Sequence, residues 1–297
     1  MYRISRPICA GLCGMIKFAT KSCQPKLFLI FVTAGAMSAC AIMKPAEVSG
    51  PRAGGPPYPV ILTEQSQRRE SSVIAFKRIN PHEGDPSAAY LQPVTATVKS
   101  LPGNLATPLY LPKIGSGTEM NEEETRESLR RFISDWRTLI GADPATLSLV
   151  ERIDQKDGTK VAKYEQRPFR YPLRGDYGKL EIHFTPDRRL LDVSSSCIPD
   201  AERLQAALAA VVPHANSEDM ITRLRAKGIT YTDSAGKQQH YQLSANSEIT
   251  TSELVIYALP TGADTLEFHL AWEVALKNAP VSYVYIDAIE DEIIATR

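Results

Sequence analysis

The side chains best suited to catalysis or metal binding are the histidines and the one cysteine far from the N-terminus. The histidines are His82, His183, His214, His240 and His269. They show no i, i+4 pair of the kind that binds metal on a helix, and on alternating strands we expect His183 and His269 to face solvent or to accept one hydrogen bond. Cys197 could pair with His183 as a nucleophile and its base, but we favour a small buried residue after a strand. The sequence therefore predicts no catalytic residue, no metal site and no cofactor.

Three arginines in a short aromatic segment are candidates for binding a partner. They are Arg167, Arg170 and Arg174, and Phe169 and Tyr171 lie between them. Guanidinium groups bind carboxylates through charge-assisted hydrogen bonds, so this segment could hold an acidic partner. Ordinary charges on a loop would give the same pattern, and both interpretations remain open.

Composition and charge restrict the class of protein. The 297 residues are 43% hydrophobic and 23% charged, which is typical of a folded protein and excludes wholesale disorder. Basic and acidic side chains number 34 each, so the net charge gives no reason to expect a nucleic-acid partner. The balance is uneven, because residues 1–39 hold five basic side chains and no acidic one. The rest of the chain is mildly acidic.

Residues 1–39 are typical of an export signal. The basic residues precede an uncharged run, 27–39, that is too short to span a bilayer as a stable helix. The small Ser38 and Ala39 before Cys40 resemble a bacterial lipobox, which implies that Cys40 is lipidated and becomes the mature N-terminus. The alternative is a plain secretory signal cleaved near Ala39. Both interpretations predict export, whether translation begins at Met1 or at Met15.

The segment 40–57 is predicted to be a lipidated tether. It is rich in Pro, Gly and Ala and has no hydrophobic period. The residue after Cys40 is Ala41, and not the Asp that favours inner-membrane retention in the lipoproteins it resembles. We therefore expect an anchor in the outer membrane, facing the periplasm.

Residues 58–120 are not assigned to a module, although four short strands are expected there. The expected strands are Tyr58–Leu62, Ser71–Phe76, Val94–Val98 and Pro108–Leu111.

From residue 121 the chain shows helices followed by strands, twice. In 121–198, Asn121 and Glu124 are spaced to cap a helix that ends at Gly141, and two hairpins follow. In 199–297, Asp200 is expected to cap a first helix, and a second helix runs from about Ser217 to Gly228. The strands expected after them are Ile229–Tyr231, Tyr241–Leu243, Leu254–Leu259, Thr265–Leu276, Val281–Asp287 and Glu292–Ala295. This order predicts an α+β fold of antiparallel sheets packed with helices.

The two modules also resemble known domains. Residues 121–198 resemble the propeptide (FTP) domain of fungalysin- and thermolysin-type metalloproteases through Phe132–Leu139, Leu149-Val150, Lys163–Gln166 and Leu180–Phe184. Residues 199–297 resemble a PepSY domain through Leu254–Tyr257, Leu270–Val274, Tyr285–Ala288 and Glu292–Ile294. The chain departs from the family pattern in its last turn, where Glu290-Asp291 replaces Thr-Gly, and in the loop 167–175.

The resemblance implies a binding function without catalysis. Family propeptides assist the folding of a protease and inhibit it by covering its cleft. The sequence has no His-Glu-x-x-His motif, so the zinc site of that protease class is missing. The resemblance therefore implies an envelope lipoprotein that binds a protease or another envelope protein in trans, as an inhibitor or chaperone. Antiparallel sheets with exposed edges can bind an extended peptide by strand addition, which supplies a mechanism. The alternatives are a structural or assembly scaffold of the envelope, or an enzyme with a site at Cys197.

Overall fold

The structure of the chain is a computed structural model. It describes residues 57–81, 84–101, 105, 107–117, 119–214, 216–244 and 247–297. The predicted signal, Cys40, the tether up to residue 56 and His82 lie outside the described residues. Within the described ranges, no helix combines the length and the apolar character that crossing a membrane requires. All of these ranges belong to one compact unit, Gly50–Arg297.

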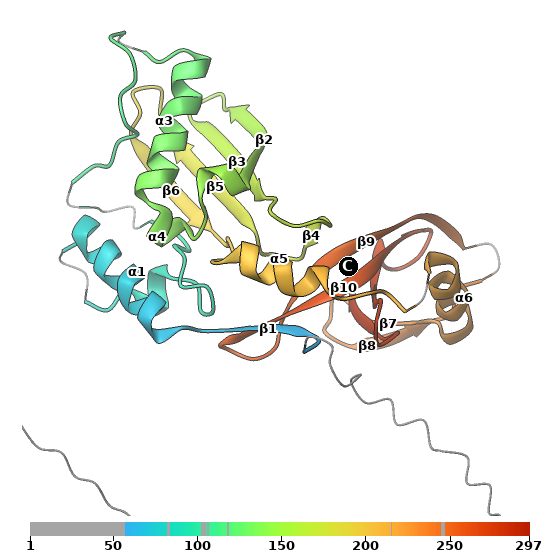
Figure 1. The fold of residues 1–297 in the computed structure, drawn as a ribbon. Helices are drawn as coiled ribbons and strands as arrows, with labels where there is room; N and C mark the ends of the chain where they lie inside the picture. Colours follow the sequence, from blue (N-terminus) through green and yellow to red (C-terminus); the bar gives the residue numbers. More distant parts are fainter. Residues whose placement is uncertain are drawn as a thin grey trace, which may run out of the picture. The chain divides into compact units, whose positions relative to one another are not determined.

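The predicted α+β fold is confirmed. Two large sheets are built mainly from antiparallel pairs, and helices precede strands in both halves of the chain (Figure 1). The first sheet has the strand order β2 (Leu147–Asp154), β3 (Lys160–Gln166), β5 (Lys179–Phe184) and β6 (Leu190–Ser195).

Helix α3 (Glu122–Asp135) covers one face of the first sheet (Figure 1). Its N-terminus has the predicted capping box, in which Asn121 and Glu124 each accept a hydrogen bond from the other's backbone N–H. The buried Phe132 of α3 packs in one core with Ile182 of β5. A short helix α4 (Arg137–Ile140) follows and ends at Gly141, whose φ of 83° suits a residue without a side chain.

The second sheet contains the C-terminal strands and two strands from earlier in the chain. Its order is β12 (Ile293–Thr296), β11 (Tyr283–Asp287), β10 (Thr265–Lys277), β9 (Glu248–Pro260) and β4 (Leu173–Arg174), and β1 (Val60–Thr63) also pairs with β10. The β4–β9 pair is parallel, whereas the other pairs of this sheet are antiparallel.

Two helices and a small hairpin pack on one face of the second sheet. They are α5 (Ala201–Ala209), α6 (Ser217–Lys227) and the pair β7 (Ile229–Thr232) and β8 (Gln238–Tyr241). Leu208 of α5 packs with Phe268, and Met220 of α6 packs with Val274. Alternate residues of β9 to β11 therefore face these helices, and the residues between them form the opposite face.

Residues 58–120 are not a separate module. Phe76, on α1 (Ser66–Ile79), and Leu91, after α2 (Ser87–Tyr90), lie in the core of the first sheet, whereas Val60 packs in a core of the second sheet. β1 precedes the predicted boundary at residue 120 but pairs with β10, which follows it. In the same way, β4 precedes the boundary at residue 198 but pairs with β9, which follows it.

Several predicted elements differ from the structure. The strand expected at Ser71–Phe76 is wrong, because these residues lie in α1, where the amphipathic face is weak and only Ser72 and Phe76 are buried. Val94–Val98 and Pro108–Leu111 contribute only isolated bridges, at Val98 and Tyr110. Asp200 does not cap α5 with its side chain. It has a φ of 54°, and its backbone oxygen accepts the N–H of Arg203. Strand β8 ends at Tyr241, where the predicted strand begins.

Candidate functional site

The two edge strands of the first sheet, β2 and β6, differ in whether another segment of the chain is hydrogen-bonded to their outer side. The β6 edge is closed by two described segments, 98–101 and 109–111, which are hydrogen-bonded to it. The closing hydrogen bonds are Ser195 N to Val98 O, Leu101 N to Asp192 Oδ1, Leu190 N to Leu109 O and Leu111 N to Arg188 O, at 2.7–2.9 Å. The opposite edge strand, β2, pairs with β3 alone among the described residues.

The free side of β2 exposes backbone groups that can bind another strand. The N–H of Arg167, directly after β3, donates to the carbonyl oxygen of Thr146, directly before β2, at 2.8 Å. These two residues therefore form a hydrogen-bonded pair that continues the β2–β3 ladder. The N–H of Gln166, which is opposite Leu147, donates away from β2 to Gly178 O. Because antiparallel pairs alternate, the backbone N–H and C=O of Leu147 and Leu149 also point away from β3.

A β-bulge divides this edge strand into two parts. The register shifts between Leu149 and Glu151, which leaves Val150 without a partner on β3. Leu149 and Val150 are 38% and 44% exposed, so this edge presents two adjacent aliphatic side chains to solvent. A bulge increases the local twist and redirects side chains, and both are means by which edge strands avoid pairing with copies of themselves.

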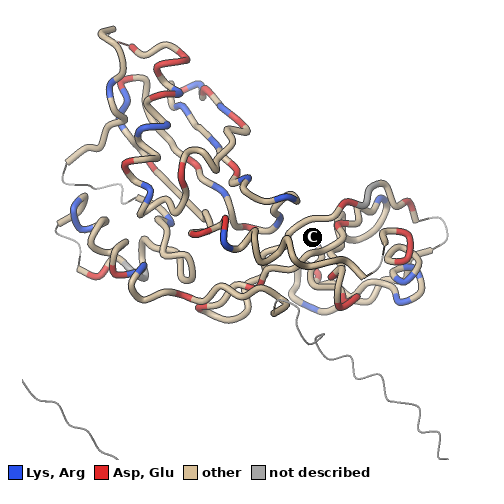
Figure 2. The backbone as a smooth tube through the Cα atoms, viewed as in Figure 1, with Lys and Arg blue, Asp and Glu red and all other residues tan. Residues whose placement is uncertain are grey.

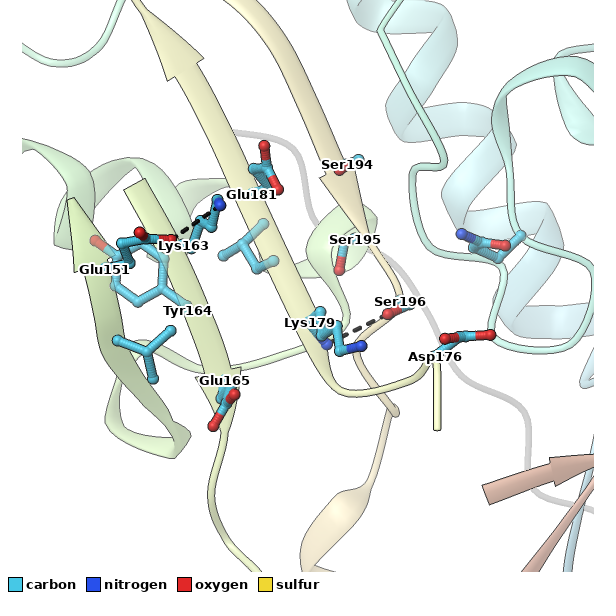
Figure 3. Close-up of a pocket in the computed structure, with 13 residues that line it drawn as sticks. Glu151, Lys163, Tyr164, Glu165, Asp176, Lys179, Glu181, Ser194, Ser195 and Ser196 are labelled. Carbon is cyan, nitrogen blue, oxygen red and sulfur yellow. Dashed lines mark hydrogen bonds and ion pairs between the residues drawn. The ribbon is translucent and has the colours of Figure 1, made fainter. Parts of the chain in front are cut away.

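The outer face of the first sheet, opposite α3, carries a shallow hollow of about 490 Å³. Figure 3 shows Glu151 of β2 pointing toward Lys163 of β3, and these two form an ion pair of 2.9 Å. Glu181 of β5 and Ser194 of β6 lie on the same face. Figure 2 shows basic and acidic residues mixed along these strands. This face therefore presents both signs of charge to solvent.

On the other face of β2 a groove of about 400 Å³ separates the edge strand from α3. It is lined by Arg126, Arg130, Ile133, Pro144, Leu147, Leu149 and Tyr164. Burial raises the pKa of Tyr164 to about 12, although Arg126 acts in the opposite direction, so its hydroxyl stays protonated. The groove thus combines an apolar floor with hydrogen-bond donors at its rim.

The three arginines predicted to bind a partner have different environments. Arg174 donates from Nε to Glu273 Oε2 at 2.8 Å and from Nη2 to Glu253 Oε1 at 2.5 Å, which ties β4 to β10 and β9. The hydrogen bond to Glu273, together with the negative charges of Glu273 and Glu253, raises the pKa of Arg174 despite the opposing effect of burial. The guanidinium is therefore engaged by two carboxylates of its own chain.

Arg167 and Arg170 remain candidates for contact with a partner. The side chain of Arg167 is 60% exposed and pairs with Glu165 at 3.0 Å. The guanidinium of Arg170 lies 5.2 Å from the ring centre of Tyr171. Together with Arg174 they line a hollow of about 410 Å³ beside the segment 167–178, which links β3 to β5 and contains β4.

Cys197 and His183 do not form a nucleophile and base pair. Cys197 is fully buried in the core of the first sheet, and its thiol donates to Lys179 O. Burial raises the pKa of this thiol to about 12, which disfavours the reactive thiolate. The residues on either side of His183 in β5 are buried, so its ring lies on the outer face, where Nε2 is 2.6 Å from Glu181 Oε1.

His269, which was expected to face solvent or to accept one hydrogen bond, is instead buried between two carboxylates. It is only 4% exposed, and it lies on β10 between the residues that pair with β1 and those that pair with β11. Its Nδ1 donates to Asp287 Oδ2 at 2.6 Å, and its Nε2 lies 3.3 Å from Glu267 Oε2. The Tyr58 hydroxyl also donates to Asp287 Oδ2, at 2.8 Å.

The buried carboxylate of Asp287 organises this polar cluster. It also accepts the backbone N–H groups of Ile289 and Glu290. Burial alone would raise the pKa of Asp287, but these donors and His269 outweigh it and lower the pKa. Burial would likewise lower the pKa of His269, but Asp287 and Glu267 outweigh it and raise the pKa. The cluster fastens the start of the described chain to β10 and β11.

Within the described ranges, no group of histidine, cysteine and carboxylate side chains is arranged to hold a metal ion. Comparisons with models of known families and with curated proteins find no match for the chain. The open edge of β2, with a hollow on each face, is the feature best suited to contact another molecule.

Proposed function

We propose that the protein is an exported binding lipoprotein without catalytic activity, anchored through Cys40 in the bacterial cell envelope, where it holds a segment of another polypeptide. The partner is a protease or another envelope protein, which the chain inhibits or assists as a propeptide does. The observation that carries the proposal is the contrast between the closed β6 edge and the open β2 edge. An extended segment that pairs with β2 gains backbone hydrogen bonds, and side-chain hollows on both faces supply selectivity.

The resemblance to protease propeptides supports the choice of partner. The residues on which this resemblance rests include Leu149 and Val150, which are exposed on the open edge. In the resembling proteases, the propeptide covers the active-site cleft of its own chain. In this proposal, the corresponding module binds a different polypeptide chain.

The test compares two substitutions at Leu149, whose N–H points away from β3. Leu149→Ala removes the side chain and keeps the donor, whereas Leu149→Pro removes both. We expect Leu149→Pro to bind an envelope partner about fivefold more weakly than Leu149→Ala, because a typical net hydrogen bond contributes about 1 kcal/mol. Binding is measured with the mature lipoprotein in detergent, after a photocrosslinker at Ser148 has identified the partner by mass spectrometry.

A crosslinker at Gln238, an exposed residue of β8 beside the second sheet, is the matched control position. Equal labelling of envelope proteins from Ser148 and Gln238 would contradict strand addition at β2. A protease that is captured at β2 and loses activity supports the inhibitor role. A partner that keeps its activity supports the scaffold alternative.

A further inference from the structure

The proposed strand addition at β2 leads to a prediction about the chemistry of the bound segment. We infer that this segment carries a large apolar side chain that enters the groove between α3 and β2, next to a carboxylate that binds Arg126. This inference rests on the proposed function and specifies its partner.

The direction of the side chains follows from strand geometry. Successive side chains of an added strand point to opposite faces, so every second one faces α3. Leu149 is on this face, because it is directly opposite Tyr164 of β3, whose ring packs against the core under α3. A neighbour of Leu149 on the added strand would lie about 5 Å from it, between Cβ atoms, and would enter the groove. The floor there includes Ile133, Leu147 and Pro144, so an aliphatic or aromatic side chain fits.

The charge of the groove favours an acidic neighbour. Its lining includes two guanidinium groups and no carboxylate. Arg130 is held by Glu127 through both Nε and Nη2. The ion pair of Arg126 with Glu122 uses Nη2 alone, at 2.8 Å, and the Arg126 side chain is 65% exposed. Arg126 therefore keeps free donors for a second carboxylate.

Tyr164 adds a neutral donor to the same groove. Its hydroxyl makes no hydrogen bond to any residue that the structure describes, although the ring is half-buried. A carboxylate or a backbone carbonyl of the bound segment would satisfy it. The outer face of β2 gives no comparable preference, because Glu151 and Lys163 are already paired there.

A second copy of the chain fits this edge poorly. Antiparallel pairing of β2 with itself about its centre places Leu149 opposite Arg152. The same pairing places Val150 opposite Glu151. Apolar residues that face charges across a strand pair gain little, and the bulge at Val150 further disturbs the ladder. The edge is therefore suited to a segment of different sequence.

The test uses fluorescent peptides and the mature lipoprotein in detergent. The first probe is a short peptide in which threonine alternates with leucine, phenylalanine and glutamate. A second peptide carries lysine in place of glutamate, and a third carries alanine in place of phenylalanine. We expect the first peptide to bind on the order of tenfold more tightly than either of the others, by fluorescence anisotropy.

Two variants separate a charge effect from a general change. Arg126→Gln is expected to remove the preference for glutamate over lysine. Arg131→Gln is the matched control, because Arg131 pairs with Glu127 on the same helix but does not line the groove. The preference should survive in this control.

The outcomes distinguish the inference from the proposed function. If all three peptides bind equally and Leu149→Pro weakens each of them, strand addition holds and the inferred chemistry is wrong. If no peptide binds while an envelope partner still crosslinks at Ser148, the inferred chemistry is again wrong. If no peptide binds and no envelope partner crosslinks at Ser148, both the inference and the proposed function are wrong. Dimerisation that Leu149→Pro abolishes, seen by sedimentation, would show that a second copy occupies the edge and would also overturn the inference.

Discussion

The two sheets differ in where they place their charges and in which parts of the chain supply their strands. The first sheet keeps its ion pairs, such as Glu151 with Lys163, on a solvent-facing surface, and it leaves β2 open. The second sheet buries charged groups, with Asp287 at 0% exposure, and it takes β1 and β4 from distant parts of the chain as additional strands. The first sheet thus leaves charged groups and the β2 edge exposed to solvent, whereas the second uses its buried charges to join parts of its own chain.

This difference indicates a division of roles within one compact unit. Surface ion pairs contribute little to stability and can rearrange when a partner binds. Buried charges are costly to leave unpaired, so their partners are held in place. We expect substitutions in the buried cluster to act on folding, and substitutions along β2 to act on binding.

The largest expected effect tests the buried cluster directly. Asp287→Ala leaves His269 without its acceptor and removes the acceptor of the Tyr58 hydroxyl. We expect the free energy of unfolding to fall by about 3–5 kcal/mol, as when one partner of a buried pair is removed. Urea unfolding measures it. The control is Asp176→Ala, because Asp176 forms an exposed ion pair with Arg297. A loss no larger than that of the control would contradict a structural role for the cluster.

A smaller effect concerns pH. The pKa of His269 is raised in the folded protein, so protonation of its ring stabilises the fold. This contribution is complete below the ordinary pKa of 6.5 and is lost as the pH rises through the higher folded-state value. We therefore expect the difference in unfolding free energy between wild type and His269→Gln to shrink as the pH rises from about 6 to about 9.

The interpretation of this experiment depends on the charged and titratable groups that face His269. They are Asp287 on β11, Glu267 on β10, Tyr58 before β1 and Glu290 in the last turn. Because the pKa of Asp287 is lowered, its contribution is present above its ordinary pKa of 3.8 and is lost only as the pH falls through the lower value. Between pH 6 and pH 9 it stays ionised. A constant difference across that range would show that His269 does not change its charge there.

The smallest expected effect is on the first sheet. Glu151→Ala removes the carboxylate that pairs with Lys163 on the outer face. We expect no resolvable change in urea unfolding, because exposed ion pairs contribute little and are screened by salt. A destabilisation comparable to that of Asp287→Ala would remove the contrast between the two sheets.

Short-range patterns predicted much of the local structure. The capping pair Asn121 and Glu124, the stop at Gly141 and the alternation of Leu180, Ile182 and Phe184 each depend on residues a few positions apart. These signals gave the helices and hairpins after residue 120 and the α+β class. They failed at Ser71–Phe76, where an apolar run without a clear period folds as part of α1.

The candidate site could be predicted only in part from the sequence. The sequence placed Leu149 and Val150 on a strand, but it could not show that this strand is an edge, because that depends on which strands pair. The arginine pattern was also ambiguous, and only the tertiary structure brought Glu273 and Glu253 beside Arg174.

After residue 120, the amino-acid sequence by itself determined the helices, the turns and most of the antiparallel strands, because caps, glycines and hydrophobic periods act between residues that are close in the chain. The tertiary structure alone decided that Tyr58 meets Asp287, 229 positions away, and that β6 is covered while β2 is not. Register and strand order depend on the packing of the whole core, so edges and buried polar clusters emerge only when distant segments come together.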